Sequence, residues 1–152
     1  MSPLLDAFSP LRYDTFVSRP LSRNQLIFLI AVDLLVLLVV TWLGFATHDR
    51  SLADGRWLTT FIPLVFSWFL AAPGLGLYRA GTADRVQDFW RPGLAAILAA
   101  PLAVLLRALW LQQTVIPIFG LVMIATTAAG MLLWRIAWAA WTTRKMLGDG
   151  RS

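Results

Sequence analysis

Four long apolar runs, separated by short polar segments, constrain this chain more than any other feature of its sequence. They cover approximately residues 24–46, 57–78, 93–111 and 116–141. An α-helix needs about 20 residues, at about 1.5 Å each, to cross the ~30 Å hydrocarbon core of a bilayer. Backbone groups find no water there, and the runs lack the alternation of barrel strands, so each is expected to be helical. The predicted fold class is all-α, a four-helix transmembrane bundle.

The composition agrees with a membrane domain flanked by two short segments. Apolar residues make up 59% of the sequence and charged residues 14%, against about 25% charged in soluble domains. Residues 1–23 contain Pro3, Pro10 and Pro20, which prevent one continuous helix, so an N-terminal strip on the inner membrane surface is expected. The first apolar run is too long for a signal-peptide core and is expected to be retained. Residues 142–152 are expected to form a cytoplasmic tail.

Positive charges fall unevenly on the two sides of these runs. Arg50 and Arg56 lie in the first loop, whereas nine Lys and Arg residues lie in the N-terminal segment, the second loop and the tail. Because such residues accumulate on the cytoplasmic side, both termini are expected in the cytoplasm of a multi-pass protein of the cell membrane. The net charge of +5 therefore reflects orientation in the lipid bilayer and predicts no nucleic-acid partner.

Tryptophan and the small residues add detail to this bundle. Tryptophans are expected at the outer interface (Trp42, Trp57, Trp110) and at the inner interface (Trp90, Trp138, Trp141). Small residues allow close helix packing in lipid, and they occur in the third run (Ala95, Ala96, Ala99, Ala100, Ala103) and the fourth (Gly120, Ala125, Ala128, Ala129, Gly130). These two runs are predicted to form an antiparallel hairpin. The second run contains Pro63 and Pro73, so its inner end is predicted to be kinked or unwound.

Three charged residues inside the apolar runs, Asp33, Arg107 and Arg135, are the strongest candidates for function. A charge near the middle of a membrane helix costs about 2.5–3.5 kcal/mol, so such residues usually face the bundle interior and pair. The helical rise puts Asp33 and Arg135 at one level, about 10 Å and 9 Å above the inner edge, and Arg107 about 20 Å above it.

Helical spacing predicts which way these charges face. Ile30, Leu37 and Gly44 share the Asp33 face, and Ala96, Ala100 and Ala103 share the Arg107 face. The Arg135 face carries Ile124, Ala128 and Met131, with Trp134 and Trp138 to one side. The prediction is an ion pair between Asp33 and Arg135, with Arg107 closing the outer side of the same cavity. The alternative is a pair that only fixes the helix register.

The residue inventory excludes several kinds of site. Cysteine and glutamate are absent and His48 is the only histidine, so no cysteine, multi-histidine or His-Glu metal site can form within one chain. The only lysine, Lys145, lies in the tail, and phosphate-binding glycine motifs are missing. No cofactor or metal is therefore predicted, and a protein without enzymatic activity is favoured. His48, in the outer loop, is a candidate accessory residue, because histidine is the side chain that can gain a proton near neutral pH.

The ordered set of charged and small residues resembles a known family. The matching positions are Asp33, Gly44, His48, Arg91-Pro92, Arg107 and Trp134-Arg135, within about residues 26–140. The sequence is similar to an uncharacterised prokaryotic family of small four-span membrane proteins, a domain of unknown function. This resemblance implies that the charged positions, including Arg91, matter; it implies no activity.

Three functional hypotheses remain open. The first is ion- or proton-coupled transport, or ligand binding, through the buried Asp33, Arg107 and Arg135 cluster. The second is a non-enzymatic subunit or assembly factor, docking on a membrane-protein partner or on a second copy of the chain. The third is an enzyme for lipid or polyprenoid substrates, whose metal would need Asp84 and Asp88, although the flanking arginines favour a solvated salt-bridged face.

Overall fold

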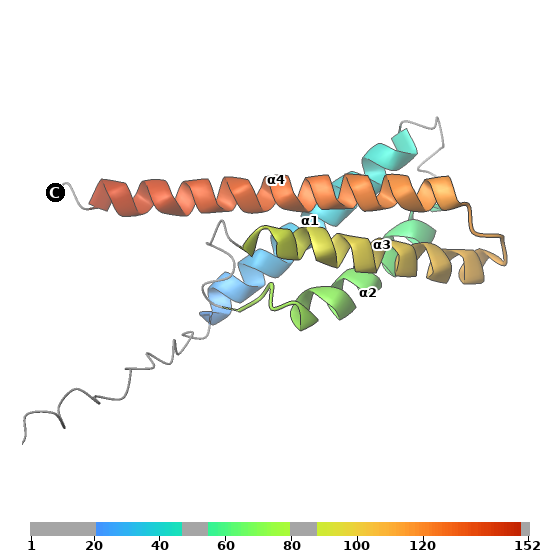
Figure 1. The fold of residues 1–152 in the computed structure, drawn as a ribbon, viewed down its shortest axis with the longest axis horizontal. Coiled ribbons are helices and arrows are strands. Elements are labelled where there is room, and N and C mark those ends of the chain that lie inside the picture. Colours follow the sequence, from blue (N-terminus) through green and yellow to red (C-terminus); the bar gives the residue numbers. More distant parts are fainter. Residues whose placement is uncertain (1–20, 47–54, 80–87, 150–152) are drawn as a thin grey trace, which may run out of the picture.

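A computed structural model of the chain describes residues 21–46, 55–79 and 88–149 (Figure 1). Within these ranges all regular structure is helical, in the order α1 (Arg23–Ala46), α2 (Leu58–Gly74), α3 (Trp90–Leu111) and α4 (Pro117–Asp149). The all-α expectation is confirmed. The predicted N-terminal strip lies outside the described residues, except for its last three.

Three of these helices are long and apolar enough to cross a membrane: α1, α3 and the Pro117–Trp141 part of α4. The fourth, α2, is apolar but has 17 residues. It ends at Gly74, one residue after Pro73, and the chain then turns through Gly76, whose φ is +72°. This conformation suits glycine, because a side chain would clash there. The C-terminal end of the second apolar run is thus unwound, as its prolines and glycines predicted.

The other helix bounds differ from the predicted runs for local reasons. α3 begins at Trp90, not Gly93, because Pro92 falls in the first turn, where a backbone N–H has no helical partner to lose. Pro101 lies inside α3, and sequence reasoning had overlooked it. At its other end, α3 stops at Gln112, which adopts the left-handed conformation with φ 51°. α4 has 33 residues and continues beyond Trp141 to Asp149.

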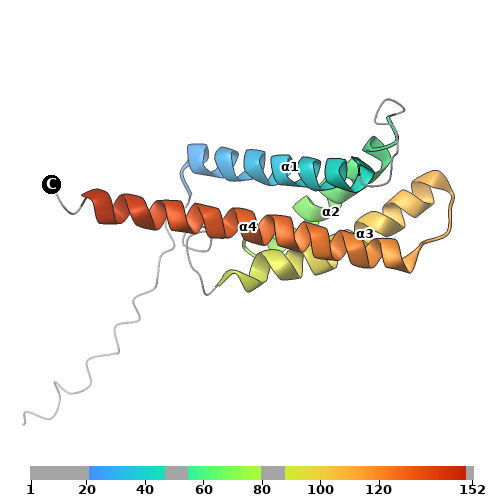
Figure 2. The same ribbon diagram turned by 90° about the horizontal axis from the view of Figure 1, so that it is seen from above.

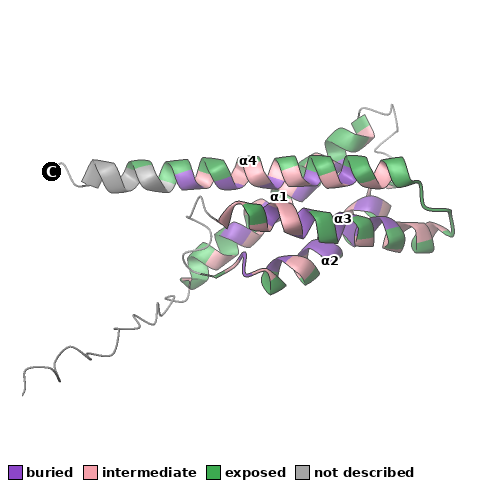
Figure 3. Cartoon of the chain, in the orientation of Figure 1, coloured by how far each residue is buried: buried purple, intermediate pink, exposed green. Residues whose placement is uncertain are grey.

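α3 and α4 form the predicted antiparallel hairpin, and α2 packs mainly on α3 (Figure 1). α1 crosses α4 at an angle in that view and runs beside it in the perpendicular view (Figure 2). The alanines predicted to line the third helix are all buried: Ala95, Ala96, Ala99, Ala100 and Ala103. Their small side chains let neighbouring backbones approach closely, which is how helices associate in lipid. Buried residues follow the inward faces of the helices and exposed ones the outward faces (Figure 3).

The small residues of α4 do not all pack against α3 as predicted. Ala125 and Ala129 are exposed, and nothing in the described chain lies within 4 Å of where a Cβ on Gly120 would stand. Gly130 packs instead against α1, where its Cβ would come within 3.0–3.1 Å of Val40 and Val36. The reason is geometric: α4 is shared between two neighbours, and a glycine is needed only where the helix backbones come closest.

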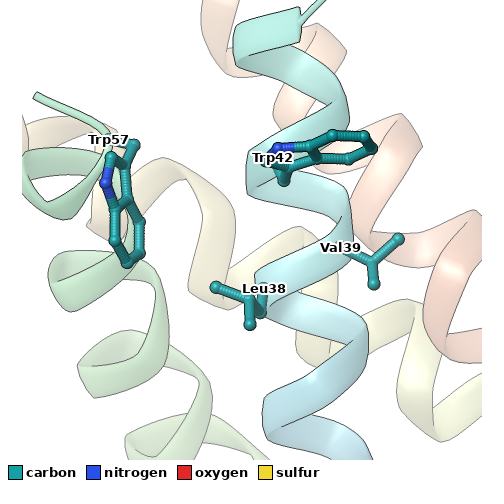
Figure 4. Close-up of a pocket in the computed structure, with 4 residues that line it drawn as sticks. All are labelled: Leu38, Val39, Trp42 and Trp57. Carbon is teal, nitrogen blue, oxygen red and sulfur yellow. The ribbon is translucent and has the colours of Figure 1, made fainter. Parts of the chain in front are cut away.

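The aromatic side chains are arranged at both ends of the bundle. Trp42, Trp90, Trp110 and Trp141 are each about half exposed, as expected of interfacial tryptophans. Trp42 and Trp57 line an apolar groove of about 440 Å³ between α1 and the start of α2, together with Leu38 and Val39 (Figure 4). Trp138 is partly covered, because it packs against Phe28, Trp134 and Trp141.

Candidate functional site

Asp33 of α1 and Arg135 of α4 form a buried ion pair. One guanidinium nitrogen, Arg135 Nη2, donates to Asp33 Oδ2 at 2.9 Å and to Oδ1 at 3.2 Å. The aspartate is 0% exposed and the arginine 3%. The structure therefore brings together the two residues whose depths in their helices matched. A single nitrogen spans both oxygens, so the pair is not the two-nitrogen fork that arginine often forms with carboxylates.

Three aromatic side chains also donate hydrogen bonds to the Asp33 carboxylate. Tyr78, in the turn after α2, donates its hydroxyl to Oδ2 at 2.8 Å, and the Trp68 indole N–H lies 3.3 Å from the same oxygen. The Trp134 indole N–H donates to Oδ1 at 3.2 Å. The Trp68 indole also lies 3.2 Å from the Tyr78 hydroxyl oxygen, which accepts from it. These five residues, Asp33, Trp68, Tyr78, Trp134 and Arg135, are referred to below as the Asp33 site.

In the Asp33 site, the Asp33 carboxylate has its hydrogen bonds more completely formed than the Arg135 guanidinium has. A carboxylate offers about four acceptor positions, and donors from α2, the following turn and α4 occupy both oxygens. Arg135 Nε, by contrast, is buried without a hydrogen-bond partner in the described part of the chain. Ser67 Oγ and Thr127 Oγ1 are buried in the same condition. Unpaired polar atoms of this kind are uncommon in native interiors and call for an explanation, such as water or a ligand.

The helices position this site through a spacing of four residues. Leu29, Asp33, Leu37 and Thr41 form the buried face of α1, and Thr127, Met131, Arg135 and Ala139 lie on the buried face of α4. The Phe28 and Trp138 ring centres lie 5.1 Å apart, as expected when Asp33 and Arg135 pair between antiparallel helices. Leu37 was predicted on this face correctly, but Gly44 is exposed. Trp134 was predicted to lie to one side, yet it faces the carboxylate.

Arg107 does not close the Asp33 site. Its Nε donates to Thr60 Oγ1 at 2.9 Å, and its guanidinium carbon lies 5.2 Å from the Phe119 ring centre. Thr60 is eight residues before Trp68 on α2, which corresponds to about 12 Å along the helix. The Arg107 side chain therefore lies between α2, α3 and α4, nearer the N-terminal ends of α2 and α4 than the Asp33 site is. The predicted three-residue cluster is thus two separate groups. A long side chain on α3 can turn toward α2 or toward the Asp33 site, and the spacing of residues along the sequence does not determine which.

Arg91 joins the start of α3 to the end of α2. Its Nη1 donates to the Leu75 carbonyl at 2.7 Å and its Nε to Asp88 at 2.8 Å. A terminal helical carbonyl otherwise lacks a partner, so this contact stabilises the unwound end of α2. Gly76 lies beside it, where a Cβ would meet Arg91 Nη1 at 3.3 Å. Arg91 is thus at the end of the bundle where α2 stops and α3 begins, and it belongs to neither charged group.

The other candidates are His48 and the acidic pair Asp84 and Asp88. His48 and Asp84 lie outside the described residues, so the Asp84 and Asp88 pair has no structural description. Within the described residues, no three His, Cys, Asp or Glu side chains come close enough to hold a metal ion. The partners that sequence reasoning missed are Trp68, Tyr78 and Trp134. One signal was available: Trp68 lies far from both ends of its apolar run, unlike the interfacial tryptophans, and is fully buried.

Comparisons with known proteins identify the family without adding an activity. A search of curated proteins found no match, and neither did a search of solved structures. A family model described as a protein of unknown function, DUF3054, matches residues 30–138. The match begins three residues before Asp33 and ends three residues after Arg135, so it contains both members of the ion pair. It covers well over half of the sequence, and the chain therefore belongs to the DUF3054 family of proteins of unknown function.

Proposed function

We propose that the chain crosses the cell membrane four times, with both termini in the cytoplasm, and couples movement of a proton to that of a small anion at the Asp33 site. The four-span arrangement is supported by the course of α2. Trp42, near the end of α1, and Trp57, before α2, line one groove, and Arg91 near the start of α3 contacts Leu75 after α2. These contacts at its two ends support a course of α2 from one end of the bundle to the other. Its 17 residues correspond to about 26 Å of helix, close to the ~30 Å hydrocarbon core, and the following turn extends this length.

The observation that carries the proposed transport is the ion pair of Asp33 and Arg135, whose arginine Nε has no described partner. In a low-dielectric interior, a lone charge is far more costly than a neutral pair. Protonation of Asp33 would remove the negative member of the pair. An anion on Arg135 would restore neutrality, and Nε offers it a buried donor.

This exchange links proton and anion in a fixed ratio. With Asp33 ionised, Arg135 is neutralised by the protein itself and the site holds no anion. With Asp33 protonated, its carboxyl hydrogen can be donated to the Tyr78 hydroxyl oxygen, the one acceptor among the side chains that the structure shows bonded to Asp33, and Arg135 takes an external negative charge instead. The side chains that bond to Asp33 in the described residues are Arg135 and Trp134 from α4, Trp68 from α2 and Tyr78 from the turn. Arg135 is the only full charge among them.

Proton flux in proteoliposomes tests the proposal. The full chain is reconstituted with a pH-sensitive dye inside the vesicles, and inward gradients of chloride, sulfate or phosphate are applied. The expected result is internal acidification that requires the anion gradient and is abolished by Asp33→Asn and by Arg135→Gln. Asp88→Asn, which alters a partly exposed ion pair outside the site, is the matched control and should retain the flux. Acidification no faster than in empty vesicles, or an undiminished rate with Asp33→Asn, would contradict the proposal.

A further inference from the structure

Helices α1, α2 and α4 each carry a buried threonine hydroxyl eight residues from a member of the Asp33 site. Thr41 lies eight residues after Asp33 on α1, Thr60 lies eight residues before Trp68 on α2, and Thr127 lies eight residues before Arg135 on α4. The helix directions make each of these steps run toward the outer end of the bundle, by about 12 Å. All three threonines are at most 5% exposed. Together with Arg107, which donates to Thr60, they are called the outer tier.

An apolar layer separates the outer tier from the Asp33 site. Leu37, Leu64 and Met131 stand four residues from the site on α1, α2 and α4, halfway to the three threonines. Each is 0% exposed, and all three belong to one contiguous core cluster. Four residues are about one helical turn, so a single layer of side chains divides the two polar groups. The outer tier is therefore a second polar environment, distinct from the first.

The hydroxyl groups of the outer tier differ in how they are satisfied. Thr41 donates to the Leu37 carbonyl at 2.8 Å, which is the usual partner of a threonine within a helix. Thr60 accepts from Arg107. Thr127 is 0% exposed, and its Oγ1 has no hydrogen-bond partner among the described residues. Its neighbour Thr126, by contrast, is exposed and donates to the Val122 carbonyl.

We infer that the outer tier is a second anion site, formed by the Arg107 guanidinium and by the hydroxyls of Thr60 and Thr127. The inference rests on the proposed function, for which it supplies the position that an anion occupies before it passes the apolar layer. A guanidinium and hydroxyl donors in a buried setting form strong, charge-assisted hydrogen bonds with an anion. The ligand class is a small free anion such as chloride, sulfate or phosphate.

A lipid headgroup offers the same chemistry, but the burial favours a free anion. Arg107 is only partly buried, whereas Thr60 and Thr127 are almost completely enclosed. A phosphate joined to a glycerol and two acyl chains would stay at the bundle surface, where it could meet the arginine alone. An anion that needs both threonines must be small enough to enter between the helices.

Anion binding to the purified full chain in an uncharged detergent tests the inference. Thermal unfolding is followed while chloride, sulfate or phosphate replaces gluconate at constant ionic strength. The wild-type chain should show a saturable rise in the unfolding temperature with at least one of these anions. Arg107→Gln should abolish it, and Thr127→Val or Thr60→Val should weaken the affinity about tenfold, the effect of losing one hydrogen bond to a charged group. Thr126→Val and Thr59→Val, whose hydroxyls donate to backbone carbonyls three or four residues earlier in the chain, are matched controls and should leave the affinity unchanged.

Several outcomes would overturn the inference. They are the absence of any saturable effect in the wild type, equal affinities for the Thr127→Val and Thr126→Val variants, and a retained effect in Arg107→Gln. A stabilisation that appears only with added phosphatidylglycerol and ignores the free anions would assign Arg107 to a lipid headgroup instead. Asp33→Asn separates this inference from the proposed function: it should abolish coupled flux and leave the binding at the outer tier intact. If Arg107→Gln fails to fold, the threonine variants decide alone.

Discussion

Gly130 of α4 lies so close to Val40 of α1 that a Cβ on the glycine would stand 3.0 Å from the valine Cγ2. Val36, one turn earlier on α1, would be 3.1 Å away. Asp33 lies three residues before Val36 on α1, and Arg135 lies five residues after Gly130 on α4. The spacing of the two helix backbones here therefore also sets how Asp33 meets Arg135. Because Gly130 has no side chain, the backbones of α1 and α4 can approach closely at this position.

Substitution of this glycine should loosen the α1 and α4 pair. Gly130→Leu is expected to destabilise the protein by about 1–3 kcal/mol, the usual cost of overpacking. Gly120→Leu, in the same helix but with open space around its Cβ, is the matched control and should unfold near the wild-type temperature. Thermal unfolding in detergent is the measurement. Val40→Ala combined with Gly130→Leu should recover part of the loss, and equal behaviour of the two leucine variants would contradict the expectation.

Replacing one member of the ion pair should reduce the free energy of unfolding more than replacing both members. Asp33→Leu leaves Arg135 buried and uncompensated, as Arg135→Leu leaves Asp33, and either change is expected to destabilise by about 3–5 kcal/mol. The double variant leaves neither charge and should be more stable than both single variants. A double-mutant cycle on unfolding free energies measures this coupling. The reversed pair, Asp33→Arg with Arg135→Asp, should also accumulate in membranes better than either of its single changes; additive losses would show that the two charges do not interact.

The indole of Trp68 should contribute through its N–H group as well as through its ring. Trp68→Phe keeps an aromatic side chain in the fully buried position but removes the donor to Asp33 Oδ2. The expected loss is about 1.5–3 kcal/mol, typical of a hydrogen bond to a charged group, together with a smaller loss from reduced ring volume. Trp110→Phe, at a position 56% exposed, should cost less than about 0.5 kcal/mol. Similar unfolding temperatures for the two variants would mean that the 3.3 Å contact carries no energy.

The course of α2 can be tested directly because the chain contains no cysteine. Arg56→Cys and Arg79→Cys each introduce a single thiol at an exposed position on either side of α2. In intact cells, a membrane-impermeant thiol reagent should label Arg56→Cys and not Arg79→Cys, because α2 is expected to cross the membrane between them. Neither change removes the excess of positive residues on the inner side, which sets orientation. Labelling of both positions, or of Arg79→Cys alone, would refute the four-span arrangement.

The sequence by itself determined the class of fold and the residues of greatest interest. Long apolar runs can only be helices in a bilayer, since every backbone group must be satisfied within its own segment. The unwound end of α2 was predicted from Pro73, Gly74 and Gly76, and the closely packed face of α3 was predicted from five alanines. A charge in an apolar helix is costly wherever the helix packs, so Asp33, Arg107 and Arg135 stood out before any neighbour was known.

What only the tertiary structure decided is which side chains complete each group. Asp33 and Arg135 could be matched because depth along a helix follows from counting residues. The rotation of α4 and the return of the chain after α2 could not be counted, so Trp134, Trp68 and Tyr78 were missed as donors and Arg107 was assigned to the wrong group. Helix rotation and crossing angle depend on how side chains of several helices pack together, and that information lies in no single segment.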